Sequence, residues 1–190
     1  HPQRIPFYVE MAVRNSIYGR PGATYLDMPD DIIQGEVDEE KVHFPKRCAE
    51  PPRSTAPEEN IQQALSVLKT AKRPLVIIGK GMAWSGAEKE VRDFIEKTGL
   101  PFLASPMGKG VMDDNHKLSV GAARSHALQE ADVVVLMGAR LNWIMHFGLP
   151  PRFNKDGKII MVNTDAEEIG KNRSVDLGIV GDAKTVLKQF

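Results

Sequence analysis

Charged residues and glycines recur directly after short apolar runs of this chain. Lys80 lies between Gly79 and Gly81 after "LVII", Arg140 follows "VVVLMGA", and Asp165 follows "KIIMVNT". An arginine can hold a phosphate through two parallel hydrogen bonds, and a carboxylate placed after a strand can accept hydrogen bonds from ribose hydroxyls. Glycine lets the backbone approach a ligand closely. These residue types predict a site for an adenine nucleotide or dinucleotide, provided that the apolar runs are neighbouring strands.

Each motif alone has a structural alternative. "GKGMAWSG" matches neither the G-x-G-x-x-G nor the G-x-x-x-x-G-K-[ST] spacing, so a tight turn explains it equally well. Lys80 and Lys109, taken singly, are typical of solvated lysines. His116, His126 and His146 have no shared metal-ligand spacing, which argues against a zinc site. The nucleotide interpretation depends on the recurrence of the same chemistry after five separate apolar runs.

The elements that would position these residues alternate regularly from Ser54 onward. Apolar periodicity predicts helices over 58–71, 86–99, 121–132 and 183–190, and strands over 75–79, 100–105, 133–139, 158–165 and 176–182. The strands are apolar along their whole length, which is typical of a parallel sheet covered on both faces. The prediction is an α/β fold, a Rossmann-like doubly wound parallel sheet with helices on both faces, whose ligands bind at the carboxyl ends of the strands.

The first 53 residues have a different pattern. Helical spacing covers 6–18, "ATYLDMP" over 23–29 predicts a short strand, and the region from 36 is charged, rich in proline and without periodicity. We therefore expect three parts: 1–35 as the end of a preceding domain, a linker over 36–53, and a nucleotide-binding domain over 54–190. Because the sequence begins with His1 rather than methionine, we also expect a longer parent protein.

Composition excludes several classes of partner. The 190 residues include 25 basic and 25 acidic side chains, so no net charge attracts nucleic acid or a membrane surface. No run approaches 18 apolar residues. Cys48 is the only cysteine, which excludes an internal disulfide and fits a reducing compartment.

Four segments, in order and spacing, resemble one enzyme family. They are "RPLVIIGKGMAWSGA", "TGLPFLASPMGKGVMDDNH", "LQEADVVVLMGARLNW" and "IIMVNTDAEEIGKNRSVDLGIVGDA". Together they resemble the central domain of thiamine-diphosphate-dependent enzymes over about residues 54–190. The upstream "GRPGATYLDMPDDI" resembles the end of the pyrimidine-binding domain that precedes it in that family.

"GARLNW" followed by "HFGLPPRF" resembles the acyl-CoA-using branch, nearest to 2-hydroxyacyl-CoA lyase and then oxalyl-CoA decarboxylase. The resemblance implies a parent enzyme that cleaves 2-hydroxyacyl-CoA to formyl-CoA and a shortened aldehyde in fatty-acid α-oxidation, with thiamine diphosphate and Mg²⁺ as cofactors. The family's activating glutamate and its magnesium motif belong to the flanking domains. This chain is then expected to be inactive alone, with no catalytic residue or metal ligand of its own.

The resemblance also extends the predicted site. Carried over by position, Arg20, Ser125 and Asp182 join Gly79, Lys80, Gly81, Arg140 and Asp165 as residues that bind the ADP part of CoA or an ADP activator. It implies a homodimeric or homotetrameric parent whose partners are acyl-CoA or ADP and its own flanking domains. It also implies a peroxisomal location, although the final "KQF" is not a signal of the S-K-L kind.

Three alternatives remain at this stage. The same strand ends hold a flavin in an FAD-binding, acetolactate-synthase-like enzyme. A stand-alone nucleotide-binding regulatory domain would share only the fold. A sirtuin-like NAD-dependent deacylase uses a related sheet, but a catalytic histidine in a suitable motif and a four-cysteine zinc module are both missing.

Overall fold

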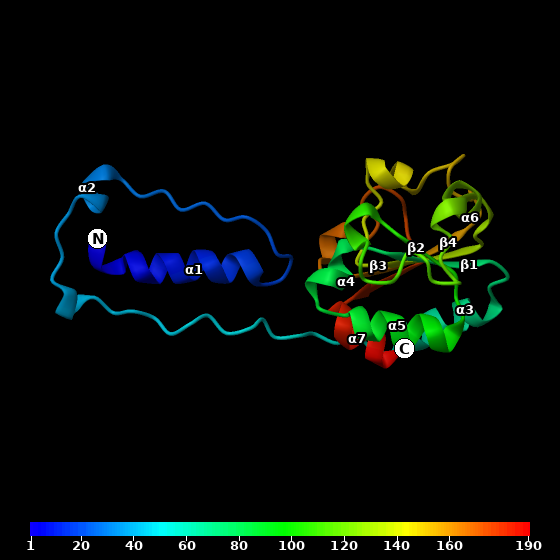
Figure 1. The fold of residues 1–190 in the computed structure, drawn as a ribbon, viewed down its shortest axis with the longest axis horizontal. Coiled ribbons are helices and arrows are strands. Elements are labelled where there is room, and N and C mark those ends of the chain that lie inside the picture. Colours follow the sequence, from blue (N-terminus) through cyan, green and yellow to red (C-terminus); the bar gives the residue numbers. More distant parts are fainter. The chain divides into compact units, whose positions relative to one another are not determined.

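The computed structural model describes residues 1–190, which divide into two compact units, His1–Pro52 and Arg53–Phe190. Figure 1 shows the fold of each, and the positions of the chain's parts relative to one another are not determined. None of the helices is both long and apolar enough to cross a bilayer.

The first unit consists of short helices joined by extended chain. Its elements are η1 (Pro2–Arg4), α1 (Ile5–Ile17), α2 (Asp30–Ile33) and η2 (Glu39–Lys41). The predicted helix over 6–18 is confirmed as α1, but the predicted strand over 23–29 is wrong. Residues of high β-propensity form a strand only where a second strand supplies hydrogen-bond partners, and this unit contains none. Thr24 instead donates its hydroxyl to the Ala12 carbonyl at 3.1 Å.

The second unit is built on a five-stranded parallel sheet of order β2-β1-β3-β4-β5. Its strands are β1 (Pro74–Ile78), β2 (Phe102–Ala104), β3 (Val133–Met137), β4 (Lys158–Asn163) and β5 (Leu177–Val180). In register, Val76 of β1 lies between Phe102 of β2 and Val135 of β3. The chain leaves β1 toward β2 and returns to β3 on the other side of β1. This reversal is the topological switch of a doubly wound sheet, so the predicted fold class is confirmed.

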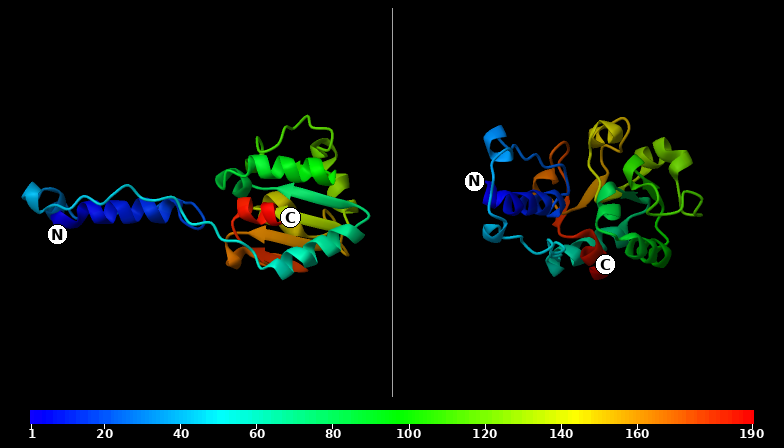
Figure 2. Two further views of the ribbon diagram at one scale, coloured as in Figure 1. Left: turned by 90° about the horizontal axis from the view of Figure 1, so that it is seen from below. Right: turned by 60° about the vertical axis from the view of Figure 1, so that its left-hand side comes forward.

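Helices cover both faces of this sheet. On one face, α3 (Glu58–Thr70), α5 (Glu88–Thr98) and α7 (Ala183–Gln189) bury Ile61, Phe94 and Val186 against alternate strand residues such as Val76 and Val135. On the other face, α6 (Arg124–Glu130) and the segment that follows β3 bury Leu128 and Met145 against the intervening residues. Figures 1 and 2 show these layers on the two sides of the strands. β1, β2, β3 and β4 contribute residues to both cores, which explains why their sequences are apolar throughout, whereas the edge strand β5 contributes to the first core only.

The predicted helix over 86–99 is confirmed but begins later. α5 carries Glu88 and Glu90 in its first turn and Lys97 in its last, as the helix dipole favours, and ends at Gly99 in the left-handed conformation with φ 69°. Gly86 has φ 61° and belongs to the preceding turn. That turn separates α5 from a short helix that the sequence pattern did not predict, α4 (Lys80–Trp84).

Candidate functional site

The loops at the carboxyl edge of the sheet rest on direct backbone contact between the ends of β1 and β3. Gly79 donates its N–H to the Met137 carbonyl at 2.8 Å, and Gly81 donates to Gly138 at 3.0 Å. A Cβ on Gly81 would lie 2.9 Å from the Gly138 Cα, and one on Gly79 would overlap the Gly138 carbonyl oxygen. The glycines are therefore required for close packing of two loops. Their contact with a cofactor stays a prediction.

Lys80, between these glycines, begins α4. Its Nζ lies 3.6 Å from the centroid of the Trp84 ring, a cation–π contact on a partly exposed surface. Trp84 itself is 45% exposed. The Lys80 ammonium is thus held beside an accessible aromatic face next to the end of β1. That placement is compatible with the predicted contact to a phosphate.

Arg140 follows the end of β3 and belongs to a charged cluster with Glu168 and Lys171. The Arg140 Nη1 and the Lys171 Nζ lie 4.0 Å and 3.3 Å from the same Glu168 oxygen, Oε1. The two cationic side chains are 46% and 59% exposed, whereas the Glu168 side chain is 7% exposed. Two accessible cations therefore lie over a buried carboxylate, and the cluster retains a net positive charge that attracts anions.

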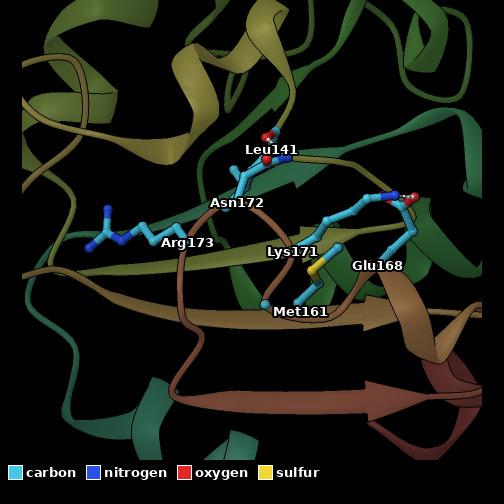
Figure 3. A pocket seen from close by; sticks show the side chains of 7 residues that line it. Leu141, Met161, Glu168, Lys171, Asn172 and Arg173 are labelled. Atoms are coloured by element: carbon cyan, nitrogen blue, oxygen red, sulfur yellow. Dashed lines mark hydrogen bonds and ion pairs between the residues drawn. The ribbon is translucent and has the colours of Figure 1, made fainter.

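A small pocket opens beside this cluster. It is lined by Leu141, Met161, Glu168, Gly170, Lys171, Asn172 and Arg173. Figure 3 shows the Lys171 side chain directed toward Glu168, while Arg173 extends to the opposite end. Arg173 donates to the carbonyls of Gly148, Asn154 and Gly157 at 2.6, 3.2 and 2.8 Å. Lys171 is thus the lining residue whose charge faces the carboxylate, and Arg173 fixes the surrounding loops.

Asp165 lies at the start of η6 (Ala166–Glu168), the 3-10 turn after β4. Its carboxylate accepts the N–H of Glu167 at 3.0 Å, and its own N–H donates to the Asn163 side chain at 3.1 Å. The residue shapes the turn that places Glu168 beneath Arg140. A second role toward ribose hydroxyls stays a prediction.

Asp182 has structural partners of its own at the end of β5. Its carboxylate caps α7 by accepting the N–H groups of Lys184 and Thr185 at 3.1 and 3.3 Å, and it pairs with Arg53 at 3.0 Å. Arg53 also donates to the Ser85 carbonyl at 2.8 Å. These contacts join the start of the second unit to two loops, which accounts for an aspartate at this position without a ligand.

The remaining predicted residues lie at the surface. Ser125 is exposed in the first turn of α6, beside Arg124, which donates to the Ile144 carbonyl at 2.6 Å. That carbonyl belongs to η5 (Trp143–Gly148), where Trp143 is 72% exposed. Arg20 is exposed and lies in the first unit, whose position relative to the second is not determined.

The structure thus brings Arg140 together with two residues that the sequence did not single out, Glu168 and Lys171. The available signal was the run "DAEEIGK" directly after a buried strand, in which an acid and a lysine stand three positions apart. No group of three or more histidine, cysteine or acidic residues is arranged to hold a metal ion.

The fold and this site define the class. Residues 61–190 match the family model "Thiamine pyrophosphate enzyme, central domain", and the chain belongs to that family. Thiamine diphosphate is the cofactor that this family implies. Human "2-hydroxyacyl-CoA lyase 1" is 51% identical over 188 residues, which cover 99% of this chain and 32% of that protein. "Oxalyl-CoA decarboxylase" of Escherichia coli is 40% identical over 183 residues, with 95% and 32% covered.

A solved structure agrees with the fold. The crystal structure of benzoylformate decarboxylase from Polynucleobacter necessarius superimposes with a TM-score of 0.76 at 20% identity, covering 100% of this chain and 36% of that one. The chain therefore spans about a third of the length of the curated relatives it matches. The predicted family, and its nearness to 2-hydroxyacyl-CoA lyases and oxalyl-CoA decarboxylase, are confirmed.

Proposed function

We propose that this chain is the central domain of a thiamine-diphosphate-dependent lyase that cleaves 2-hydroxyacyl-CoA to formyl-CoA and an aldehyde one carbon shorter. The 51% identity to the human protein of that name supports the substrate class. In the parent, thiamine diphosphate supplies the carbanion stabilisation. The domain contributes binding and spacing rather than catalysis, and residues 1–35 belong to the preceding pyrimidine-binding domain. A homodimeric or homotetrameric, peroxisomal parent that uses Mg²⁺ is part of the same proposal.

The task of this domain is to bind the ADP part of CoA, or an ADP activator, at the carboxyl edge of the sheet. The observation that carries this proposal is the pair of half-exposed cations, Arg140 and Lys171, beside the ends of β3 and β4. Lys80 adds a third cation at the end of β1. Binding energy from the nucleotide, which is remote from the carbon that reacts, can hold the acyl end in place without itself being catalytic.

Titration calorimetry of the 190-residue chain with ADP, CoA and FAD tests the ligand. Binding of ADP and CoA without FAD is the expected result. Selective FAD binding would favour the alternative of an acetolactate-synthase-like enzyme. Silence toward all three ligands would leave a spacer domain and remove the nucleotide from the proposal.

Replacement of Arg140 by alanine in the full-length protein tests the residue. A charge-assisted contact to phosphate that is lost should raise the apparent KM for acyl-CoA, or the activation constant for ADP, by about tenfold, with little change in kcat. Arg92→Ala, an exposed arginine on α5, is the matched control and should leave both constants unchanged. Equal constants for Arg140→Ala and wild type would refute the assignment of Arg140.

A further inference from the structure

Glu168 is the one charged residue of the chain that is buried, and its surroundings connect two strand ends. It closes the turn that follows β4, while Arg140 reaches it from the segment that follows β3 and Lys171 lies three residues further along the chain. A carboxylate withdrawn from water is costly unless cations compensate it. The negative charge of Glu168 therefore lies directly beside the two cations of the candidate site, Arg140 and Lys171.

The two cations differ in their relation to the carboxylate. Lys171 donates a hydrogen bond to Oε1 at 3.3 Å and so compensates the buried charge directly. Arg140 stands 4.0 Å from the same oxygen, which is an ion pair beyond hydrogen-bond distance. That pair holds the guanidinium beside the buried carboxylate. An arginine held in this way can meet a phosphate with less loss of rotamer freedom than an unrestrained one.

We propose that Glu168 is a positioning residue of the nucleotide site: its buried carboxylate holds the Arg140 guanidinium in the orientation in which it binds a phosphate of an adenosine diphosphate group. The inference rests on the proposed function, since it takes the ligand of Arg140 from there. Glu168 acts through Arg140, and Lys171 compensates the carboxylate so that the cluster still attracts an anion.

A purely electrostatic role of Glu168 predicts the opposite change in the affinity for ADP. Glu168 carries a negative charge near the expected phosphate, so removal of that charge should tighten anion binding if Arg140 stayed in place. Under the positioning role, the same removal releases Arg140 and weakens binding. The direction of the change in affinity therefore separates the two.

The decisive experiment is a double-mutant cycle on the 190-residue chain, with the Kd for ADP measured by calorimetry. Glu168→Gln should weaken ADP binding by about five- to twentyfold in the wild-type background but not weaken it in the Arg140→Ala background, where only the loss of a negative charge remains. Glu167→Gln, the same charge change on the exposed neighbour, is the control and should have no effect. If Glu168→Gln tightens ADP binding in the wild-type background, or weakens it equally in both backgrounds, the proposal is wrong.

A second measurement does not need the ligand. ¹⁵N relaxation of the Arg140 Nε–Hε group reports side-chain motion on the picosecond to nanosecond scale. We expect a restrained guanidinium in the wild type and a mobile one in Glu168→Gln. Equal mobility in the two proteins overturns the positioning role, whatever the affinity for ADP. If wild type fails to bind ADP, the proposed function fails, and the relaxation data still decide whether Glu168 restrains Arg140.

Glu168→Asp covers the case in which the glutamine variant does not fold. It keeps the charge but moves it back by one methylene, so the distance from the carboxylate to Arg140, already 4.0 Å in the wild type, increases. An intermediate loss of affinity with an unchanged unfolding midpoint supports the proposal. Wild-type affinity together with wild-type Arg140 mobility contradicts it.

Discussion

At the scale of single residues, the carboxyl edge of the sheet depends on the absence of three side chains. Gly79, Gly81 and Gly138 allow the loops after β1 and β3 to pack backbone against backbone. Gly138 also has φ 57°, a conformation that residues with a Cβ rarely adopt. Lys80 and Arg140 emerge from these same loops. The loop contact therefore sets where both cations stand.

Gly138→Ala tests this contact. The new Cβ would lie 2.8 Å from the Gly81 Cα, and backbone atoms cannot yield as a flexible side chain can. We expect the free energy of unfolding in urea to fall by about 2 kcal/mol or more, because overpacking adds to the strain of a positive φ. Gly121→Ala is the matched control, since its nearest neighbour would be the Ser119 Oγ at 3.8 Å. A loss of equal size in both variants would mean that the close approach is not responsible.

Some residues of the candidate site could be predicted from the sequence and others could not. Lys80 and Arg140 were placed correctly at strand ends because they follow apolar runs in the chain. Glu168 was missed because its burial depends on Arg140 and on two parallel strands that are neighbours only in the fold. Asp182 has the type expected of a ligand residue, but a helix cap also prefers aspartate, and one sequence cannot distinguish the two.

At the scale of elements, most strands and helices of the second unit were predictable because strands β1 to β4 are buried on both faces and the longer helices have one apolar face. The wrongly predicted strand over 23–29 and the unpredicted helix over 80–84 show the limit. The apolar, β-rich run over 23–29 has no partner strand, and α4 is only five residues long, too short for helical periodicity to appear. Local sequence therefore predicts an element that is long enough to show periodicity and that has packing partners in the fold. It fails where the element is very short or where no partner strand is present.

Asp132 links three elements at the opposite, amino edge of the sheet. Its carboxylate accepts the N–H groups of Lys72 and Arg73 at 2.7 and 2.9 Å, from the turn between α3 and β1, and its carbonyl accepts the N–H of Lys158 at the start of β4. Partial burial acts to raise the pKa of Asp132, but the hydrogen bonds from Lys72 and Arg73 outweigh it and lower the pKa below its ordinary value of 3.8. The ionised form is therefore favoured by folding.

A pH titration of stability tests this link. A carboxyl whose pKa is lower in the folded state stabilises the protein fully above its unfolded pKa and loses that contribution as the pH falls through the folded pKa. Asp132→Asn should lower the free energy of unfolding by about 1 kcal/mol at neutral pH, a value reduced by solvent screening. The difference from wild type should shrink below about pH 4. Asp156→Asn, an exposed aspartate, is the control; a difference that is constant with pH would contradict the argument.

At the scale of the whole molecule, the two units differ in what they bury. Every buried apolar residue lies in Arg53–Phe190, in two cores on the two faces of the sheet, whereas no residue of His1–Pro52 is buried. Burial of apolar surface is the main favourable contribution to folding. The first unit leaves large apolar side chains exposed, among them Tyr25 at 89% and Phe44 at 66%. The stability of the chain is therefore concentrated in the second unit.

Removal of residues 1–52 tests this concentration. The shortened chain, Arg53–Phe190, should unfold within about 2 °C of the complete chain in a thermal melt followed by circular dichroism, because residues 1–52 contribute no buried residue to either core. Arg53 must be kept, since it bridges Asp182 and the Ser85 carbonyl. Arg53→Ala in the shortened chain should cost about 1 kcal/mol, or roughly 3 °C, a modest loss because the pair is partly exposed. If the deletion lowers the midpoint by more than the Arg53→Ala substitution does, the first unit stabilises the sheet through contacts that its exposed surface does not suggest.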